Sequence, residues 1–170
     1  INIGLIGQYA TWAGTVLSRD APIVLVADPG TEGESALRLG RIGFDRVAGY
    51  LDDPMGVMAA APERTQRASR LTVREFEQRR VDIGGIQIVD IRNPGEFALG
   101  SVPGATAIPV GQLPGRVDEL DPSAPTVVYC AGGYRSSVTA SLLRLRGFHD
   151  VSDLVGGFGA WVEVTQMPAR

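Results

Sequence analysis

The segment Pro125-Thr-Val-Val-Tyr-Cys130 is an apolar run that leads into a glycine-containing loop, Ala131-Gly-Gly-Tyr-Arg135, and then into a helical pattern over residues 135–146. The run is rich in β-branched residues, which is typical of a strand buried on both faces of a parallel sheet. Gly147 follows this pattern directly, at the position after a helix C-terminus where a residue in the left-handed conformation, usually glycine, is common. This order of strand, loop and helix predicts one unit of an α/β fold.

The residues on either side continue this alternation of strands and helices. Such alternation predicts an α/β fold with a mostly parallel central sheet flanked by helices. Thr72 and Glu75 have the spacing of a capping box, so we expect the first helix of this domain to begin there. The predicted elements are helices at 72–80, 111–120 and 135–146, a helical turn at 94–98, and strands at 86–90, 106–108, 125–129 and 151–154.

A second copy of the pattern lies near the N-terminus. Pro22-Ile-Val-Leu-Val-Ala27 matches the strand before Cys130, and Gly43-Phe-Asp-Arg-Val47 parallels Gly147-Phe-His-Asp-Val151. Ala27 stands where a nucleophile would be, and nothing before Ile1 matches the strand at 86–90. We therefore interpret the chain as a partial tandem repeat and the C-terminal piece of a longer protein. The predicted domains are an incomplete, inactive repeat at 1–58, a polar linker at 59–71 and an active domain at 72–166.

The composition excludes several classes of function. The chain has 170 residues and a net charge of −3, so a nucleic-acid groove or a polybasic membrane patch is not expected. Its apolar runs are shorter than the roughly 20 residues that cross a bilayer, and no signal-peptide pattern opens the chain. We expect a cytoplasmic protein whose partners are small molecules or proteins, not nucleic acid or a membrane.

The basic residues and the single cysteine narrow the chemistry further. All 16 basic residues are arginines, which excludes a Schiff-base or phosphate-loop lysine and, with the abundant Ala, Gly and Pro, is typical of a GC-rich bacterial genome. One Cys and one His, His149, cannot form a disulfide or a tetrahedral Cys/His zinc site. We expect no metal and no cofactor, and His149 is interpreted as a solvated turn residue.

Cys130 is the candidate nucleophile, because ligands of α/β sheets bind at the carboxyl ends of strands. Loop amides and the start of the following helix favour a thiolate and an anionic persulfide. Gly132 and Gly133 allow a tight curl of the backbone, and Arg135 adds a charge suited to an anionic sulfur donor. From the loop alone, a small buried hydrophobic residue remains an equal interpretation of Cys130.

Three linked motifs favour catalysis over simple burial. They are Asp90-Ile-Arg-Asn-Pro-Gly-Glu-Phe-Ala-Leu-Gly-Ser-Val-Pro-Gly-Ala105, Cys130-Ala-Gly-Gly-Tyr-Arg-Ser136 and Gly156-Gly-Phe-Gly-Ala-Trp161. In order and spacing these motifs resemble the rhodanese family, which implies a rhodanese-like fold and a sulfurtransferase with Cys130 as nucleophile and sulfur carrier. The resemblance also implies that Ala131, Gly132, Gly133, Tyr134 and Arg135 bind the anionic substrate, while Asp90 and Arg92 support the site through an ion pair and hydrogen bonds.

The loop length separates two related chemistries. Cys130 and Arg135 have the spacing C-x4-R, whereas the related Cys-dependent phosphatases have C-x5-R, one residue longer, to surround a phosphate. We therefore expect transfer of a sulfane sulfur from thiosulfate or a low-molecular-weight persulfide, through a Cys130 persulfide, to a thiol or another nucleophile from outside the chain. The alternatives are a non-catalytic rhodanese module for sulfur sensing or protein docking and, less favoured, a phosphatase.

Two further motifs carry weaker expectations. Gly7-Gln-Tyr-Ala-Thr-Trp-Ala-Gly14, with 22–27 and 43–51, resembles the inactive rhodanese repeat that follows the metallo-β-lactamase-fold domain of bacterial persulfide dioxygenase-like fusions. That resemblance implies such a domain upstream as a partner, and its iron ligands are not present in this chain. Gly156-Gly-Phe-Gly159 lacks the spacing of a dinucleotide loop and is predicted to be a turn into the helix of Trp161.

Overall fold

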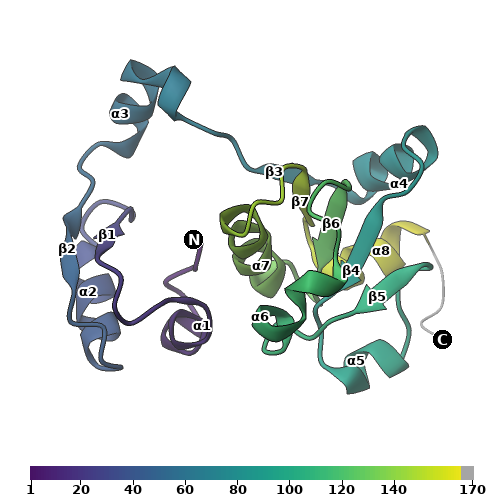
Figure 1. The fold of residues 1–170 in the computed structure, drawn as a ribbon, viewed down its shortest axis with the longest axis horizontal. Helices are drawn as coiled ribbons and strands as arrows, with labels where there is room; N and C mark the ends of the chain where they lie inside the picture. The colour runs from purple at the N-terminus through teal and green to yellow at the C-terminus, as the bar shows by residue number, and fades with distance from the viewer. Residues whose placement is uncertain (166–170) are drawn as a thin grey trace. The chain divides into compact units, whose positions relative to one another are not determined.

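The computed structural model describes residues 1–165 and divides them into two units (Figure 1). One unit comprises residues 3–67, and the other comprises residues 68 onward together with Ile1 and Asn2. No helix within the described part of the chain is long and apolar enough to cross a membrane. The predicted end of the active domain, residue 166, lies outside the described residues.

The second unit is built on a five-stranded sheet in which every neighbouring pair of strands is parallel. This confirms the predicted α/β fold with a parallel central sheet. The strand order is β3-β7-β6-β4-β5, which places β6 in the centre. The strands are β3 (Ser69–Leu71), β4 (Gln87–Asp90), β5 (Ala105–Ala107), β6 (Thr126–Tyr129) and β7 (Val151–Leu154).

Helices cover both faces of this sheet (Figure 1). One of them, α7, contacts β6 and β7, whereas α4 and α8 contact each other on the opposite side. The helices of the unit are α4 (Val73–Asp82), α5 (Pro94–Ala98), α6 (Leu113–Arg116), the 3-10 helix η2 (Val117–Glu119), α7 (Tyr134–Leu145) and α8 (Gly157–Thr165).

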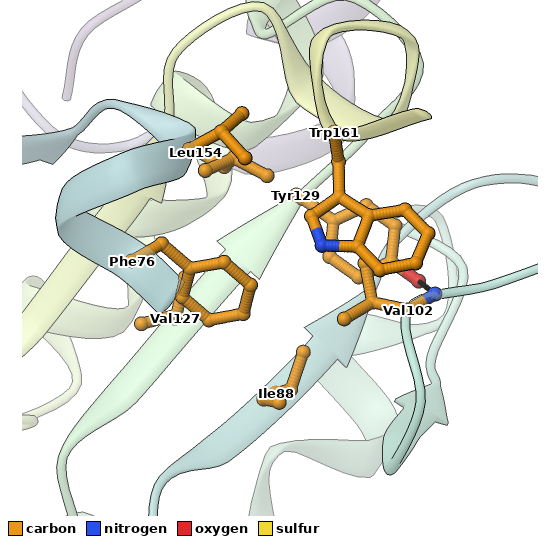
Figure 2. Close-up of a cluster of buried hydrophobic side chains, with 8 residues drawn as sticks. Phe76, Ile88, Val102, Val127, Tyr129, Leu154 and Trp161 are labelled. Carbon is orange, nitrogen blue, oxygen red and sulfur yellow. Dashed lines mark hydrogen bonds between the residues drawn. The ribbon is translucent and has the colours of Figure 1, made fainter. Parts of the chain in front are cut away.

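The central strand β6 is buried along its whole length, as its β-branched sequence predicts. Val127 and Tyr129 point to the face that carries Phe76 of α4 and Trp161 of α8, and these side chains form one apolar cluster (Figure 2). The Tyr129 hydroxyl accepts a hydrogen bond of 3.1 Å from the backbone N–H of Val102. The packing holds the end of β6, and so the start of the next loop, in a fixed position.

Capping boxes begin two of the helices. At α4 the Thr72 hydroxyl accepts from the N–H of Glu75, and the Glu75 carboxylate accepts from the N–H of Thr72, as the spacing predicts. At α5 Asn93 and Glu96 form the same motif. Both carboxylates therefore occupy equivalent positions in the first turn of a helix.

The first unit contains a two-stranded parallel sheet of β1 (Ile23–Leu25) and β2 (Val47–Tyr50) joined by α2 (Glu32–Gly40). Its strand, helix and parallel strand follow the same order as β6, α7 and β7. The common origin of the two halves as a tandem repeat, and the inactivity of the first half, stay predictions. The remaining elements are α1 (Tyr9–Val16), α3 (Pro54–Ala60) and the 3-10 helix η1 (Pro62–Arg64).

Two predicted segments differ from the structure. The stretch at 59–71 was expected to be a linker, but its last three residues form β3, which pairs with β7 at the edge of the sheet. A strand of three residues is too short to show a clear alternation of apolar and polar residues. The helix expected at 111–120 is only α6 followed by η2, because Pro114 and Gly115 disfavour a longer regular helix.

We expect the cluster around β6 to carry much of the stability of the second unit. Replacing the fully buried Phe76 by Ala leaves a cavity and should lower the free energy of unfolding by about 3–5 kcal/mol. The matched control is Val81→Ala on the same helix, an exposed position whose change should stay within about 0.5 kcal/mol. Urea unfolding followed by Trp161 fluorescence in a Trp12→Phe background measures both, and equal effects of the two substitutions would contradict the assignment of this core.

Candidate active site

Cys130 directly follows β6 at the carboxyl end of the central strand and is only 1% exposed. The backbone N–H of Gly133 donates to its Sγ at 3.1 Å. The Ser136 hydroxyl lies 3.6 Å from the same sulfur and donates to the carbonyl of Gly133 at 3.0 Å. The thiol is therefore held by the loop that follows it and by the first turn of α7.

The conformation of this loop depends on glycine. Gly133 is the N-cap of α7 and has φ of +97°, a left-handed value that costs glycine little. Gly133 is buried, whereas Ala131 and Gly132 are exposed. The first N–H groups of a helix have no acceptor within the helix, so α7 begins with donors beside the sulfur. This arrangement is suited to an anion at Cys130.

A second turn packs against the loop of Cys130. The N–H of Phe158 donates to the Cys130 carbonyl at 2.7 Å, and the N–H of Gly159 donates to the Ala131 carbonyl at 3.1 Å. Gly157 has φ of +60°, and a Cβ there would lie 2.3 Å from the Cys130 oxygen. The sequence predicted a turn over residues 156–159, whereas the structure already includes residues 157–159 in α8. These residues also support the site, a role that the two adjacent glycines could have indicated.

Arg135 is bound by a carboxylate that the sequence alone left without a role. Its two terminal nitrogens donate to the two oxygens of Glu96 at 2.9 and 2.8 Å. The hydrogen bond from Arg135 lowers the pKa of Glu96 to about 2, so this carboxylate is ionised at neutral pH. Arg135 lies in the first turn of α7, two residues after the Gly133 N–H that donates to Cys130. The positive charge of Arg135, which was predicted to attract an anionic substrate, is thus compensated by Glu96.

Asp90 and Arg92 form a buried ion pair at the end of β4. The Arg92 Nη2 lies 2.6 Å from the Asp90 Oδ2, and it also donates to the carbonyl of Gly100 at 2.6 Å. Its guanidinium carbon lies 4.0 Å from the centre of the Phe158 ring, a cation–π contact. The pair is therefore linked, through Phe158, to the turn that supports the loop of Cys130.

The other candidate residues lie elsewhere or contribute little. His149 is exposed and follows the C-terminal end of α7, whereas Cys130 precedes its N-terminal end. Across residues 1–165 no group of three or more His, Cys, Asp or Glu side chains could hold a metal ion. The structure thus brings together the loop from Cys130 to Arg135, the Asp90–Arg92 pair, Glu96 and the turn at 156–159.

Comparison with known proteins identifies the second unit. Residues 72–164 match the rhodanese-like domain family. A sulfurtransferase of Allochromatium vinosum is 37% identical over 86 residues, which cover 51% of this chain and 80% of that protein. The thiosulfate sulfurtransferase GlpE of Pseudomonas aeruginosa is 37% identical over 99 residues, covering 58% and 86%. A rhodanese-like domain protein of Staphylococcus aureus superposes with a TM-score of 0.52 at 30% identity, covering 55% and 90%. The chain belongs to the rhodanese-like domain family.

Proposed function

We propose that this protein is a sulfurtransferase that carries a sulfane sulfur on Cys130 as a persulfide. The donor is thiosulfate or a low-molecular-weight persulfide, and the acceptor is a thiol or another nucleophile. The observation that carries the proposal is the position of the sulfur, which accepts the Gly133 N–H at 3.1 Å at the carboxyl end of β6. Backbone donors at that point stabilise a negative charge on sulfur, both as a thiolate and as a persulfide.

The proposed reaction is a double displacement. The Cys130 thiolate attacks the outer sulfur of the donor, a new S–S bond forms to Sγ, and the donor's own S–S bond breaks with its electron pair leaving on sulfite or on a thiolate. The acceptor then attacks the outer sulfur of the persulfide, and Cys130 leaves as a thiolate. Because these 170 residues contain a single cysteine, an acceptor thiol is not one of their own side chains.

Each predicted site residue has a role in this proposal. The loop of residues 131–135 is assigned to the anionic sulfur, which accepts the Gly133 N–H. Asp90 and Arg92 support residues 156–159 through Phe158. A metallo-β-lactamase-fold domain as an upstream partner, and localisation in the cytoplasm, stay predictions.

The alternative functions predict different behaviour. A phosphatase must bind a phosphate dianion in its loop, and the C-x4-R spacing and the compensation of Arg135 by Glu96 both disfavour that ligand. A docking or sensing module needs no turnover. Thiocyanate formation from thiosulfate and cyanide should occur with the native protein and vanish in the Cys130→Ala variant. Hydrolysis of p-nitrophenyl phosphate without formation of thiocyanate would favour the phosphatase. The absence of both activities would favour a docking or sensing module.

The packing of Gly157 against the Cys130 carbonyl gives a second prediction. A Gly157→Ala substitution places a methyl group in the space of that oxygen and displaces the loop. Displacements of about 1 Å can cost roughly 100-fold in rate, so we expect sulfur transfer to fall roughly 10- to 100-fold in kcat/KM.

The control for this variant is Gly85→Ala. Gly85 has a similar left-handed φ of +82° but nothing within 4 Å of an added Cβ, so it isolates backbone strain from the steric clash. Both variants should lose some stability, but only the one at residue 157 should lose activity. Equal rates in the two variants would show that contact with the Cys130 loop is not needed.

A further inference from the structure

The charges beside Cys130 are paired one to one. Arg92 is bound to Asp90 and Arg135 is bound to Glu96, each through more than one hydrogen bond. Only the second pair is partly open to solvent, with side-chain exposures of 20% for Arg135 and 33% for Glu96. Arg135 lies in the first turn of α7, two residues after Gly133, whose N–H donates to the Cys130 Sγ. The two terminal nitrogens of Arg135 are therefore already hydrogen-bonded to a carboxylate when a donor molecule binds.

We propose that Glu96 determines the donor selectivity of Cys130 by neutralising Arg135, so that donors with one negative charge are favoured over the thiosulfate dianion. The inference rests on the proposed sulfur transfer and specifies its substrate class. The physical reason is that the electrostatic energy of a donor scales with its charge. A carboxylate next to the site penalises a dianion twice as much as a monoanion of the same shape.

The position of Glu96 is held by three donors. Besides the two Arg135 nitrogens, the backbone N–H of Asn93 donates to its Oε2 at 3.0 Å and completes the capping box of α5. If Glu96 turned away to release Arg135, the backbone N–H of Asn93 would lose its acceptor and the capping box of α5 would lose one of its two hydrogen bonds. Its low pKa, about 2, also means that protonation does not remove its charge near neutral pH. The compensation of Arg135 is thus a permanent feature of the site.

Two small donors isolate the effect of charge. Thiosulfate carries two negative charges, whereas methanethiosulfonate replaces one oxyanion by a methyl group and carries one. In both reactions a bond forms between Cys130 Sγ and the sulfane sulfur, and the S–S bond to the oxidised sulfur breaks. The electron pair leaves on sulfite in the first case and on methanesulfinate in the second. Neither reaction requires an oxidant or a reductant.

The test compares kcat/KM for the two donors in the native protein and in Glu96→Gln. The amide of Gln can still accept the Asn93 N–H, so the cap is retained while the charge is lost. Removing one negative charge near the reacting sulfur should raise the ratio of kcat/KM for thiosulfate to kcat/KM for methanethiosulfonate roughly 10-fold. Glu96→Ala, which removes the charge without adding an amide, should shift the ratio in the same direction.

The control is Glu75→Gln in the other capping box. Glu75 has the same place in the first turn of α4 and accepts the same hydrogen bond from its N-cap residue, Thr72. The ratio of kcat/KM for the two donors should stay within about 2-fold of native in this variant, because Glu75 lies outside the set of groups around Cys130. A merely structural role of Glu96 would lower both rates together and leave the ratio unchanged, which would overturn the inference and leave the proposed function intact. No transfer from either donor in the native protein would instead overturn the proposed function.

Discussion

The contact between two backbone segments, the turn at 156–159 and the loop that begins at Cys130, is the constraint on which the site depends. Two N–H groups of the turn donate to the carbonyls of Cys130 and Ala131, and Gly157 comes so close to the first of these that it has no room for a side chain. Residues 157–159 are the first residues of α8, whose Trp161 belongs to the core beside β6. The packing of the core thereby fixes the position of the loop that carries the reactive sulfur.

The charged groups around the sulfur are arranged so that none of the arginines named in the site stands alone. Burying Arg92 is costly unless its charge is matched, and Asp90 matches it at the end of the neighbouring strand β4. Arg135 is matched by Glu96 at the start of α5. The stabilisation of an anionic sulfur consequently falls mainly to neutral donors, namely the Gly133 N–H and the first turn of α7. Such donors are fixed before the reaction and need little reorganisation during it.

Most of the fold could be predicted because its signals are local. The central strand β6 lies in an apolar run rich in β-branched residues, and the start of α4 is given by Thr72 and Glu75, three residues apart. The candidate nucleophile was found for the same reason, since strand, Cys130 and glycines are adjacent. The pair of Glu96 and Arg135 was not predicted, because 39 residues separate the two side chains and only the order of strands brings them together. The edge strand β3 was missed because three residues carry no periodicity.

The central claim, that Cys130 carries a transferable sulfur, is tested most directly by the intact mass of the reduced protein after incubation with thiosulfate or methanethiosulfonate, followed by cyanide. The account predicts a gain of one sulfur atom that cyanide removes and that the Cys130→Ala variant does not show. A protein that gains no sulfur from either donor, or a variant that gains it equally without its only cysteine, would contradict the account.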